Sequence, residues 1–306
     1  VYSPILVLGD CSQEDYIWGT HNNVHFALNS IETLKSLQGL TTPLLLHCNI
    51  DTGMGRLGIR PEEVGELLEL LKAQPLFNCA GIFTHFPRAD EPNTGSVARQ
   101  RQMYEKVIDL FKQNDFHPIY IHAANSAAAL RFPNPHDTHI RIGIALYGCN
   151  PDPLQEFPLE LRPVIRLAGP VVKVTRVPAE TPISYGSTYS TPKETTIATI
   201  ALGYGHGLPR LLTNTGHFLV HGKRYRIVGR VTMDYTMIDA GEQSDISVGD
   251  EAVAIGYQKS AVITPDEIAA HCNTIGYEIL CNMSSRIPRY YIRNDTVISK
   301  KPPVYV

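Results

Sequence analysis

A glycine-rich segment with a single arginine, residues 47–58, holds residue types that can bind an anion. It reads His-Cys-Asn-Ile-Asp-Thr-Gly-Met-Gly-Arg-Leu-Gly and follows the apolar run Leu44–Leu46, which is typical of a buried strand. Residues 59–63 then carry a proline and two acids, which favour the start of a helix. Glycine lets the backbone approach a ligand, and Arg56 is the strong anion-binding side chain of the loop. The same spacing also fits a tight loop with a solvated arginine.

Other polar residues follow short apolar runs farther along the chain. They are His85 after 80–83, Asn125 and Ser126 after 118–121, and Arg141 within 139–142. In parallel α/β folds, ligands bind beyond the carboxyl ends of the strands, so we expect these side chains to gather at one edge of a sheet. Taken singly, each also has an ordinary structural explanation, as a hydrogen-bonding histidine, a helix N-cap or a surface arginine.

The elements that must position these residues alternate between strand and helix over the first 150 residues. Apolar runs predict six strands, at 5–8, 24–27, 44–46, 80–83, 118–121 and 139–142. The helices between them carry apolar residues at helical spacing, with Asn29 or Ser30 and then Ser96 as predicted N-caps. Such alternation favours a parallel sheet. A closed (β/α)8 barrel needs eight strands, so a barrel would lack two units, whereas an open doubly wound sheet would lack none.

The pattern changes near a proline-rich stretch at residues 151–163. Beyond it, short alternating runs separated by turn residues predict strands at 171–174, 197–200, 218–220, 226–228 and 251–255, and one helix at 265–271. This pattern is typical of a mostly antiparallel second domain.

The composition excludes several classes of protein. The 306 residues are 43% hydrophobic and 19% charged with a formal net charge of -3, which favours a globular protein that binds neither nucleic acid nor membrane. No apolar run approaches the ~20 residues that span a bilayer, and the first residues do not resemble a signal peptide. The six cysteines are scattered, so we expect reduced thiols in a cytoplasmic protein and no zinc or other metal site.

Three motifs carry a resemblance to a known family. Asp51–Gly58, Asp-Thr-Gly-Met-Gly-Arg-Leu-Gly, resembles the signature of alanine racemases, the pyridoxal-phosphate enzymes that interconvert L- and D-alanine. Residues 141–148 are similar to that family's Arg-Φ-Gly-Ile-Ala-Φ-Tyr-Gly, where Φ is apolar, and residues 230–234 to its Arg-x-x-Met-Asp. The resemblance implies a (β/α)8 barrel of fold type III, truncated at its N-terminus, over residues 1–160, which binds pyridoxal 5'-phosphate. A mostly antiparallel β domain over 161–306 would follow.

The resemblance also implies roles for residues of the barrel. His85 would lie beside the cofactor ring, and Arg141 would face the pyridine nitrogen. The phosphate would be held by Asn125, Ser126, Gly143 and Ile144. An arginine keeps its own proton at ordinary pH, so the pyridine nitrogen would stay unprotonated. The ring would then be a weaker electron sink, and reprotonation at Cα would be favoured over side reactions such as transamination.

The second domain would supply the other half of the site. Tyr185, in Ile-Ser-Tyr-Gly, resembles the family's catalytic tyrosine base, which reaches the site from the other subunit of a homodimer. Racemisation needs proton removal on one face of Cα and delivery on the other, so two bases are required. A tyrosine with a pKa near ~10 needs cationic or hydrogen-bonding neighbours such as His85 and Arg141 to act as one. Arg56 and the backbone N–H of Met233 would bind the substrate carboxylate.

The sequence departs from the family at three places. Asn49 stands where many members carry a lysine that can be carbamylated to orient the arginine equivalent to Arg56, and an Asn with a bound halide is one way to fix the same geometry. Ser285 replaces a tyrosine that touches phosphate and narrows the entrance. The lysine that forms an imine with the cofactor lies in a Lys-x-Asn-x-Tyr-Gly-His segment, which is absent from this sequence.

The absent lysine leads to a further expectation. The only early candidate, Lys35, lies on an amphipathic helix and is predicted to be solvated. We therefore expect the chain as given to lack the first part of the barrel and to be unable to form the imine or racemise alanine by itself.

The favoured function is an alanine racemase that supplies D-alanine for cell-wall peptidoglycan. The alternatives are a racemase or fold-type III decarboxylase of broader specificity, and a non-catalytic pyridoxal-phosphate carrier. The second domain disfavours the carrier because it brings Tyr185 and Met233.

Overall fold

The computed structural model describes residues 3–91, 95–151 and 159–304. The chain forms two compact units, which are described separately. Unit 1 comprises residues up to 145 together with 151–160, and unit 2 comprises 146–150 together with 161–306.

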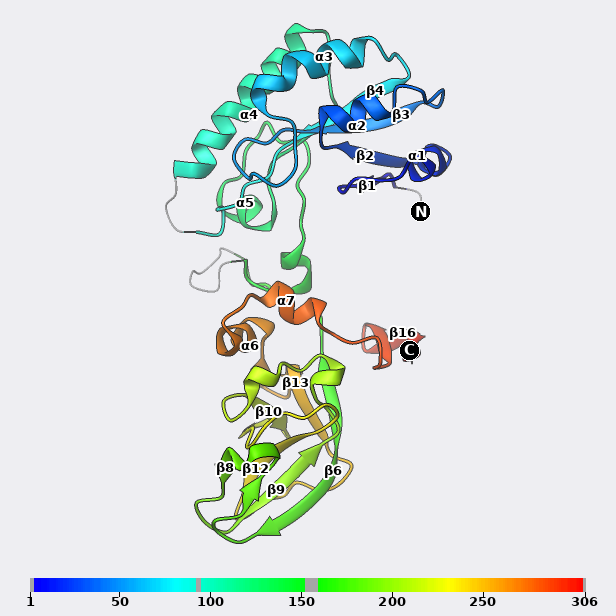
Figure 1. Cartoon of the computed structure of the whole chain (residues 1–306). Coiled ribbons are helices and arrows are strands. Elements are labelled where there is room, and N and C mark those ends of the chain that lie inside the picture. Colours follow the sequence, from blue (N-terminus) through cyan, green and yellow to red (C-terminus); the bar gives the residue numbers. More distant parts are fainter. Residues whose placement is uncertain (1–2, 92–94, 152–158, 305–306) are drawn as a thin grey trace. The chain divides into compact units, whose positions relative to one another are not determined.

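Unit 1 is built on one parallel sheet whose strands follow one another in chain order. The order is β1 (Ile5–Val7), β2 (Val24–Leu28), β3 (Leu44–Asn49), β4 (Phe77–Phe83) and β5 (Tyr120–His122). The sheet curls, and helices follow the strands on its outer side (Figure 1). These helices are α1 (Gln13–Thr20), α2 (Ile31–Ser36), α3 (Val64–Lys72), α4 (Gly95–Gln113) and α5 (Ser126–Arg131), with short 3-10 turns η1 (Pro61–Glu63) and η2 (Ile144–Tyr147). Sequential parallel strands with outer helices form part of a barrel wall.

The two faces of β3 show how the sequence positions the site. Leu44, Leu46 and Cys48 are fully buried in the core that the helices cover. Because side chains alternate along a strand, His47 and Asn49 point to the opposite face. In α3 the predicted apolar residues Val64, Leu67, Leu68 and Leu71 are all buried.

Two thiols meet between β3 and β4. The Sγ atoms of Cys48 and Cys79 lie 3.7 Å apart, and both cysteines are buried and unoxidised. These two side chains are free thiols, which agrees with the prediction of reduced cysteines.

The predicted sixth strand at His139–Ile142 is wrong. Its backbone N–H groups still reach β5 and the residues after it, from His139 to the carbonyl of Ile121 at 3.2 Å and from Arg141 to that of Ala124 at 2.9 Å. The hydroxyl of Thr138, however, takes the place of a strand partner, since it accepts from the N–H of Ile121 at 2.8 Å and donates to the carbonyl of Ile119 at 3.0 Å. A side chain therefore ends the ladder beside β5. The predicted cap Ser96 is also wrong, since it lies inside α4, whereas Ser30 caps α2 as expected. Helix α1 was not predicted, because its apolar residues lack clear helical spacing.

Unit 2 is mostly antiparallel, as predicted. Its main sheet has the order β11-β10-β13-β6-β9-β12, with β14 beside β13. The strands are β6 (Leu167–Val177), β9 (Thr195–Ile200), β10 (His217–Val220), β11 (Lys223–Arg226), β12 (Thr236–Gly241), β13 (Glu251–Gln258) and β14 (Ala261–Ile263). Two hairpins accompany it, β7 (Pro182–Ile183) with β8 (Tyr189–Ser190), and β15 (Arg289–Arg293) with β16 (Thr296–Lys301).

Helical segments of unit 2 carry the loops of interest. They are α6 (Pro265–Cys272), α7 (Gly276–Cys281) and the 3-10 turns η3 (Tyr185–Ser187), η4 (Tyr204–His206) and η5 (Arg210–Leu212). The strand predicted at 226–228 is displaced: β11 ends at Arg226, and Ile227 makes only an isolated bridge to Ile238. In the described ranges, no helix is long and apolar enough to cross a membrane.

Candidate active site

The glycine-rich loop after β3 folds around its own carboxylate. Asp51 accepts hydrogen bonds from the backbone N–H groups of Gly53, Met54 and Gly55 at 2.8–3.1 Å. Burial raises the pKa of Asp51, but these N–H groups outweigh it and lower the pKa overall. The backbone donors of the loop are therefore used internally. The charged group that the loop presents is the exposed guanidinium of Arg56, which helps to lower the pKa of His85.

Asn49 is buried and joins an amide network below this loop. Its Nδ2 donates to Oδ1 of Asn29 at 2.8 Å, and Nδ2 of Asn29 donates to Asp10 and to the carbonyl of Leu8, each at 3.2 Å. Asn49 thus holds neighbouring strand ends together. Lys35 lies on α2, where it is exposed, as predicted, and forms an ion pair with Glu66.

Arg141 is the most strongly held cation of unit 1. Its NH1 donates to the carbonyl of His122 at 2.6 Å and to Nδ1 of the same residue at 2.9 Å. Its NH2 donates to the carbonyl of Thr84 at 2.7 Å and reaches the carbonyl of Ala123 and Nδ1 of His85, each at 3.3 Å. The guanidinium also lies 5.2 Å from the ring centre of Phe83. All these acceptors are neutral, and burial lowers the pKa of Arg141 to about 10.

One N–H of Arg141 stays available. Among the described residues, no acceptor is found for its Nε. The arginine therefore presents one oriented donor in a site that contains no carboxylate partner for it within the same residues.

His85 is shaped by this arginine. Burial, and then the charges of Arg141 and Arg56, lower its pKa to about 4, so it is neutral at physiological pH. Because a guanidinium only donates, the 3.3 Å contact from NH2 of Arg141 favours an unprotonated Nδ1 and a proton on Nε2, where Nδ2 of Asn125 lies at the longer distance of 3.5 Å. The Nε2–H can then serve as a hydrogen-bond donor.

The four predicted phosphate-binding residues are brought together next to β5. Asn125 caps α5 by accepting from the N–H of Ala128 at 3.0 Å, and its Nδ2 donates to the carbonyl of Phe86. The hydroxyl oxygen of the buried Ser126 accepts from the N–H of Gly143 at 2.9 Å. Ile144 follows at the start of η2 and is buried. A small loop joins a helix start, a hydroxyl and backbone N–H groups, which suits a phosphate.

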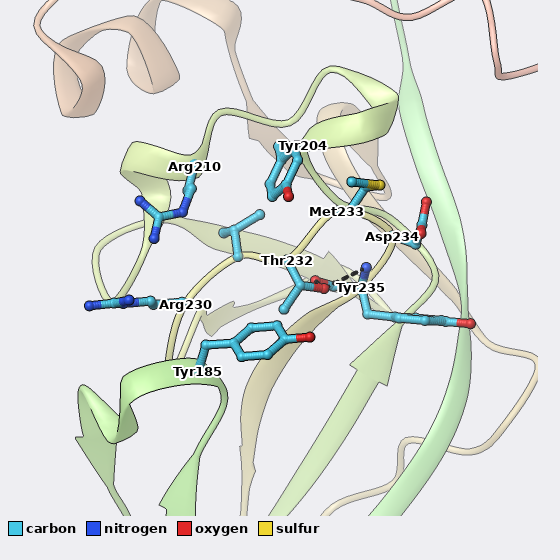
Figure 2. A pocket seen from close by; sticks show the side chains of 9 residues that line it. Tyr185, Tyr204, Arg210, Arg230, Thr232, Met233, Asp234 and Tyr235 are labelled. Carbon is cyan, nitrogen blue, oxygen red and sulfur yellow. Dashed lines mark hydrogen bonds between the residues drawn. The ribbon is translucent and has the colours of Figure 1, made fainter. Parts of the chain in front are cut away.

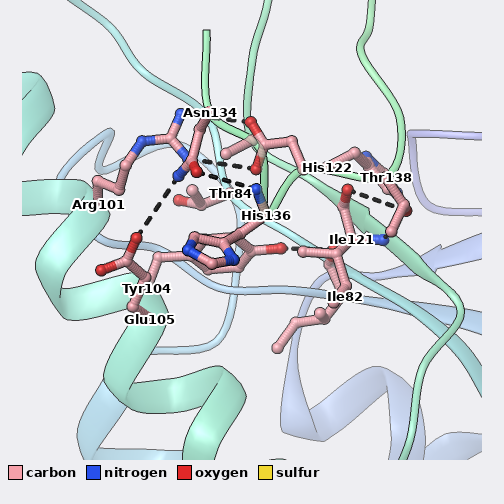
Figure 3. A network of polar contacts seen from close by, with 12 residues as sticks. Ile82, Thr84, Arg101, Tyr104, Glu105, Ile121, His122, Asn134, His136 and Thr138 are labelled. Carbon is pink, nitrogen blue, oxygen red and sulfur yellow. Dashed lines mark hydrogen bonds and ion pairs between the residues drawn. The ribbon is translucent and has the colours of Figure 1, made fainter. Parts of the chain in front are cut away.

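Some residues that the sequence analysis did not identify form polar contacts next to the carboxyl ends of β4 and β5. The hydroxyl of Tyr104, on α4, donates to the carbonyl of Ile82 at 2.6 Å, and Arg101 forms a partly buried ion pair with Asp137. Figure 3 shows Thr84 and His122 within the same polar network. The hydrophobic spacing of α4 could not single out Tyr104, and no motif of the sequence marks His122.

Unit 2 contains a pocket of about 570 Å³ around the two predicted residues Tyr185 and Met233. Figure 2 shows Tyr185 and Tyr204 on opposite sides of the pocket, and Arg210 and Arg230 together on one side of it. The remaining lining residues are Val231, Thr232, Asp234 and Tyr235. The side chain of Tyr185 is 73% exposed and that of Met233 51% exposed.

The backbone, more than side-chain packing, positions Tyr185. Ser184 has a φ of 64° and Gly186 a φ of 70°, so the residues on both sides of Tyr185 adopt left-handed conformations. The hydroxyl of Ser184 donates to the carbonyl of Arg230 at 2.7 Å, which ties the turn to the Arg230–Asp234 segment. Ser285 lies in an exposed loop after α7, where its carbonyl accepts from the N–H of Val304.

A second cluster is also found in unit 2. His217, Glu267 and His271 place ligand-type atoms within 4.8 Å of one another. Glu267, however, is paired through both oxygens with Arg224, which neutralises its charge.

A half-buried arginine with neutral acceptors lies at the carboxyl edge of the curled parallel sheet, beside a serine–glycine loop, and this arrangement suits the barrel class of pyridoxal-phosphate enzymes. Comparisons with known proteins define the family within this class. A family model described as "Alanine racemase, N-terminal domain" matches residues 1–151, and one described as "Alanine racemase, C-terminal domain" matches 164–291.

Relatives and solved structures agree with these matches. Alanine racemase 2 of Bacillus subtilis is 37% identical, with 99% of this chain and 80% of the relative covered. The alanine racemase of Carboxydothermus hydrogenoformans is 39% identical, with 95% and 80% covered. The crystal structure of alanine racemase from Bacillus anthracis with bound L-Ala-P has a TM-score of 0.90 at 36% identity, covering 99% of this chain and 79% of that one. The chain belongs to the alanine racemase family, the pyridoxal-phosphate-dependent isomerases that interconvert L- and D-alanine and supply D-alanine.

The residues present fit this cofactor. Arg141 offers an oriented N–H whose natural partner is an unprotonated ring nitrogen, and it has no carboxylate partner among the described residues that would compete. The hydroxyl of Ser126, whose oxygen accepts from the N–H of Gly143, can still donate its own O–H to a phosphate.

Proposed function

We propose that residues 1–160 hold the cofactor and that residues 161–306 supply a proton-transferring tyrosine, as two parts of an alanine racemase site. The single observation that carries this assignment is the hydrogen bonding of Arg141, since all of its acceptors are neutral and one donor is left over. A carboxylate in this place would protonate the ring nitrogen, whereas a guanidinium cannot.

In this proposal, bound pyridoxal phosphate supplies an electron sink that acidifies the substrate Cα–H. Arg141 donates a hydrogen bond through Nε–H and keeps its proton, which limits the sink and favours return of a proton to Cα. Asn125, Ser126 and the N–H groups of Gly143 and Ile144 hold the phosphate.

Tyr185 moves a proton at its phenolic oxygen on one face of Cα. A phenolate is favoured by nearby donors and cations, and His85 offers such a donor at Nε2–H. Arg56 and the N–H of Met233 bind the substrate carboxylate and so fix which bond at Cα faces the base. The lysine of the family's Lys-x-Asn-x-Tyr-Gly-His segment would act on the opposite face.

We further propose that Tyr185 acts in the site of a second copy of the chain, in a homodimer located in the cytoplasm. The high exposure of Tyr185 within its own unit supports the first statement. The six free cysteines support a reducing compartment.

Subunit mixing tests this arrangement. In a protein that also carries the family's lysine segment, the Tyr185→Phe and Arg141→Lys variants should each be nearly inactive, and their random mixture after refolding should regain about a quarter of the parent racemase activity. The gain arises because half of the dimers are mixed and each has one site with both residues intact. A mixture as inactive as its parts would mean that Tyr185 serves its own chain, and active parent variants would refute the residue assignment itself.

A further inference from the structure

Three histidines on different strands of unit 1 form one hydrogen-bonded row that ends at Arg141. His25 lies on β2, His47 on β3 and His122 on β5, and all three are buried. Nδ1 of His25 lies 2.9 Å from Nε2 of His47, and Nδ1 of His47 lies 2.9 Å from Nε2 of His122. NH1 of Arg141 completes the row, 2.9 Å from Nδ1 of His122.

The sheet register explains how these residues meet. Ala27 pairs with His47, His47 with Gly81, and Gly81 with Tyr120. Paired residues and residues two apart point to the same face of a sheet, so His25, His47 and His122 share one face. His25 comes two residues before the partner of His47, and His122 comes two residues after Tyr120. The row therefore climbs toward the carboxyl edge, where Arg141 lies.

A glycine opens the path between β3 and β5. The two strands are separated by β4, and Gly81 is the residue of β4 that lies in register between them. A Cβ at Gly81 would lie 2.3 Å from Nδ1 of His47 and 2.6 Å from its Cε1. Any side chain here would therefore displace the imidazole of His47 and separate it from His122.

The chemistry of arginine sets the direction of the whole row. A guanidinium donates and never accepts, so Nδ1 of His122 must be unprotonated. A neutral His122 then carries its proton on Nε2 and donates to Nδ1 of His47. His47 in turn carries its proton on Nε2 and donates to Nδ1 of His25.

The surroundings favour neutral rings throughout. Burial, and then the neighbouring positive charges, lower the pKa of His47 to about 3 and that of His122 to about 2, and burial also lowers the pKa of His25. The titratable or charged groups that face the row are Arg141, Tyr120 and His139. The ring of Phe83 stacks on that of His122, with 5.0 Å between ring centres.

We propose that His25, His47 and His122 form a polarised row, each neutral with its proton on Nε2, which holds the guanidinium of Arg141 in one orientation. His25 and His47 are positioning residues that act through His122. The row is not a proton relay, because the arginine at its end does not release a proton. Its consequence for catalysis rests on the proposed function, since Arg141 must face the cofactor for its orientation to matter.

Nitrogen-15 NMR of histidine side chains tests the row without any cofactor. In the full chain, the three rings should show a bare Nδ1 and a protonated Nε2 across the whole range from pH 5 to 8 in which an ordinary histidine titrates. Assignment comes from the signals lost in His25→Phe, His47→Phe and His122→Phe. A protonated Nδ1 in His47 or His122, or an ordinary titration of either ring, would overturn the proposal.

A second measurement separates positioning from simple packing. Removal of the His47 imidazole in His47→Phe should shift the Nε–H resonance of Arg141. In a protein that also carries the family's lysine segment, it should lower kcat by up to about a hundredfold with little change in KM. Gly81→Ala should reproduce both effects by moving the ring, and His47→Gln, whose amide can still bond to His122, should retain part of the activity. The matched control His117→Phe changes an exposed histidine and should alter neither.

The outcomes distinguish the two proposals. An unchanged Arg141 resonance in folded His47→Phe would refute the row. A shifted resonance with unchanged kcat would support the row and refute the proposed catalytic part of Arg141. If His47→Phe fails to fold, Gly81→Ala and His47→Gln carry the same test.

Discussion

Arg141 and Tyr185, to which we assign the central chemistry, have opposite surroundings. Arg141 is half-buried, and its NH1 and NH2 groups are bonded to carbonyl oxygens and imidazole nitrogens from two segments of unit 1, residues 84–85 and 122–123. Tyr185 is 73% exposed and lies in a turn whose neighbouring residues, Ser184 and Gly186, have positive φ. One group must keep its proton and its place, and preorganised donors of this kind are effective because they need no rearrangement during reaction. The other must gain and lose a proton and reach a substrate.

The largest expected effect is on the exposed side. All kinetic effects given below are expected in a protein that also carries the family's lysine segment. Tyr185→Phe removes the group that moves a proton on one face of Cα and should slow abstraction from L-alanine by about 10²–10⁴-fold, and abstraction from D-alanine far less. Exchange of the Cα hydrogen with solvent, measured for each enantiomer, checks this asymmetry. Equal losses in both directions would remove Tyr185 from the one-face assignment, and the stability of the variant should match the parent because the ring is exposed.

Arg141 should be sensitive to small changes in side-chain shape. Arg141→Lys keeps the charge but loses the planar fork, and we expect kcat to fall by about 10²–10³-fold, as for removal of one preorganised donor. Arg176→Lys, at an exposed arginine paired with Glu194, is the matched control and should be silent. Arg141→Glu should instead let the ring nitrogen hold a proton and raise the share of transamination. An unaltered product ratio in that variant would mean that Arg141 does not face the nitrogen.

Unit 1 should also be the more acid-sensitive unit. The unfolded chain binds a proton at each histidine near pH ~6.5, whereas folded His47 and His122 do so only near pH 3 and pH 2, from their pKa values of about 3 and about 2. Below pH ~6.5 the unfolded state binds more protons, so each of these histidines lowers the free energy of unfolding by about 1.4 kcal/mol per pH unit as the pH falls. Hydrogen exchange at pH 7 and pH 5 should show β3 and β5 losing protection more than β6 and β9. His47→Phe should reduce the difference.

The smallest effect is expected at Met233. Its proposed contribution is its backbone N–H, and its side chain is half exposed, so Met233→Leu should change kcat/KM less than about twofold. Steady-state kinetics with alanine measure this. A large loss of kcat/KM would show that the Met233 side chain itself shapes the pocket. The contrast between unit 1, where side chains form the site, and unit 2, where the backbone of Met233 binds substrate, would then not hold.

The sequence predicted the elements with strong hydrophobic periodicity. The strand around Leu44–Leu46, the buried face of α3 and the antiparallel character of unit 2 all follow from spacing and turn residues. The strand predicted at 139–142 failed because the single hydroxyl of Thr138 replaces ladder bonds, a substitution that apolar runs do not reveal.

The site was predictable residue by residue but not as a network. Motifs located Arg141, His85 and Ser126, since each sits in a distinctive local pattern. The roles of His25 and His47 depend on strand register and on a missing side chain at Gly81, which are properties of several strands at once. No local spacing contains that information.

The neighbouring thiols of Cys48 and Cys79 allow local opening of unit 1 to be measured. Both lie on adjacent strands with their sulfur atoms 3.7 Å apart and shielded from solvent. A thiol reagent can reach them only when β3 and β4 separate, so the rate of labelling counts such openings in the native protein. The same strands carry His47 and Gly81. The rate of thiol labelling therefore also reports how often the part of the sheet that holds the histidine row opens.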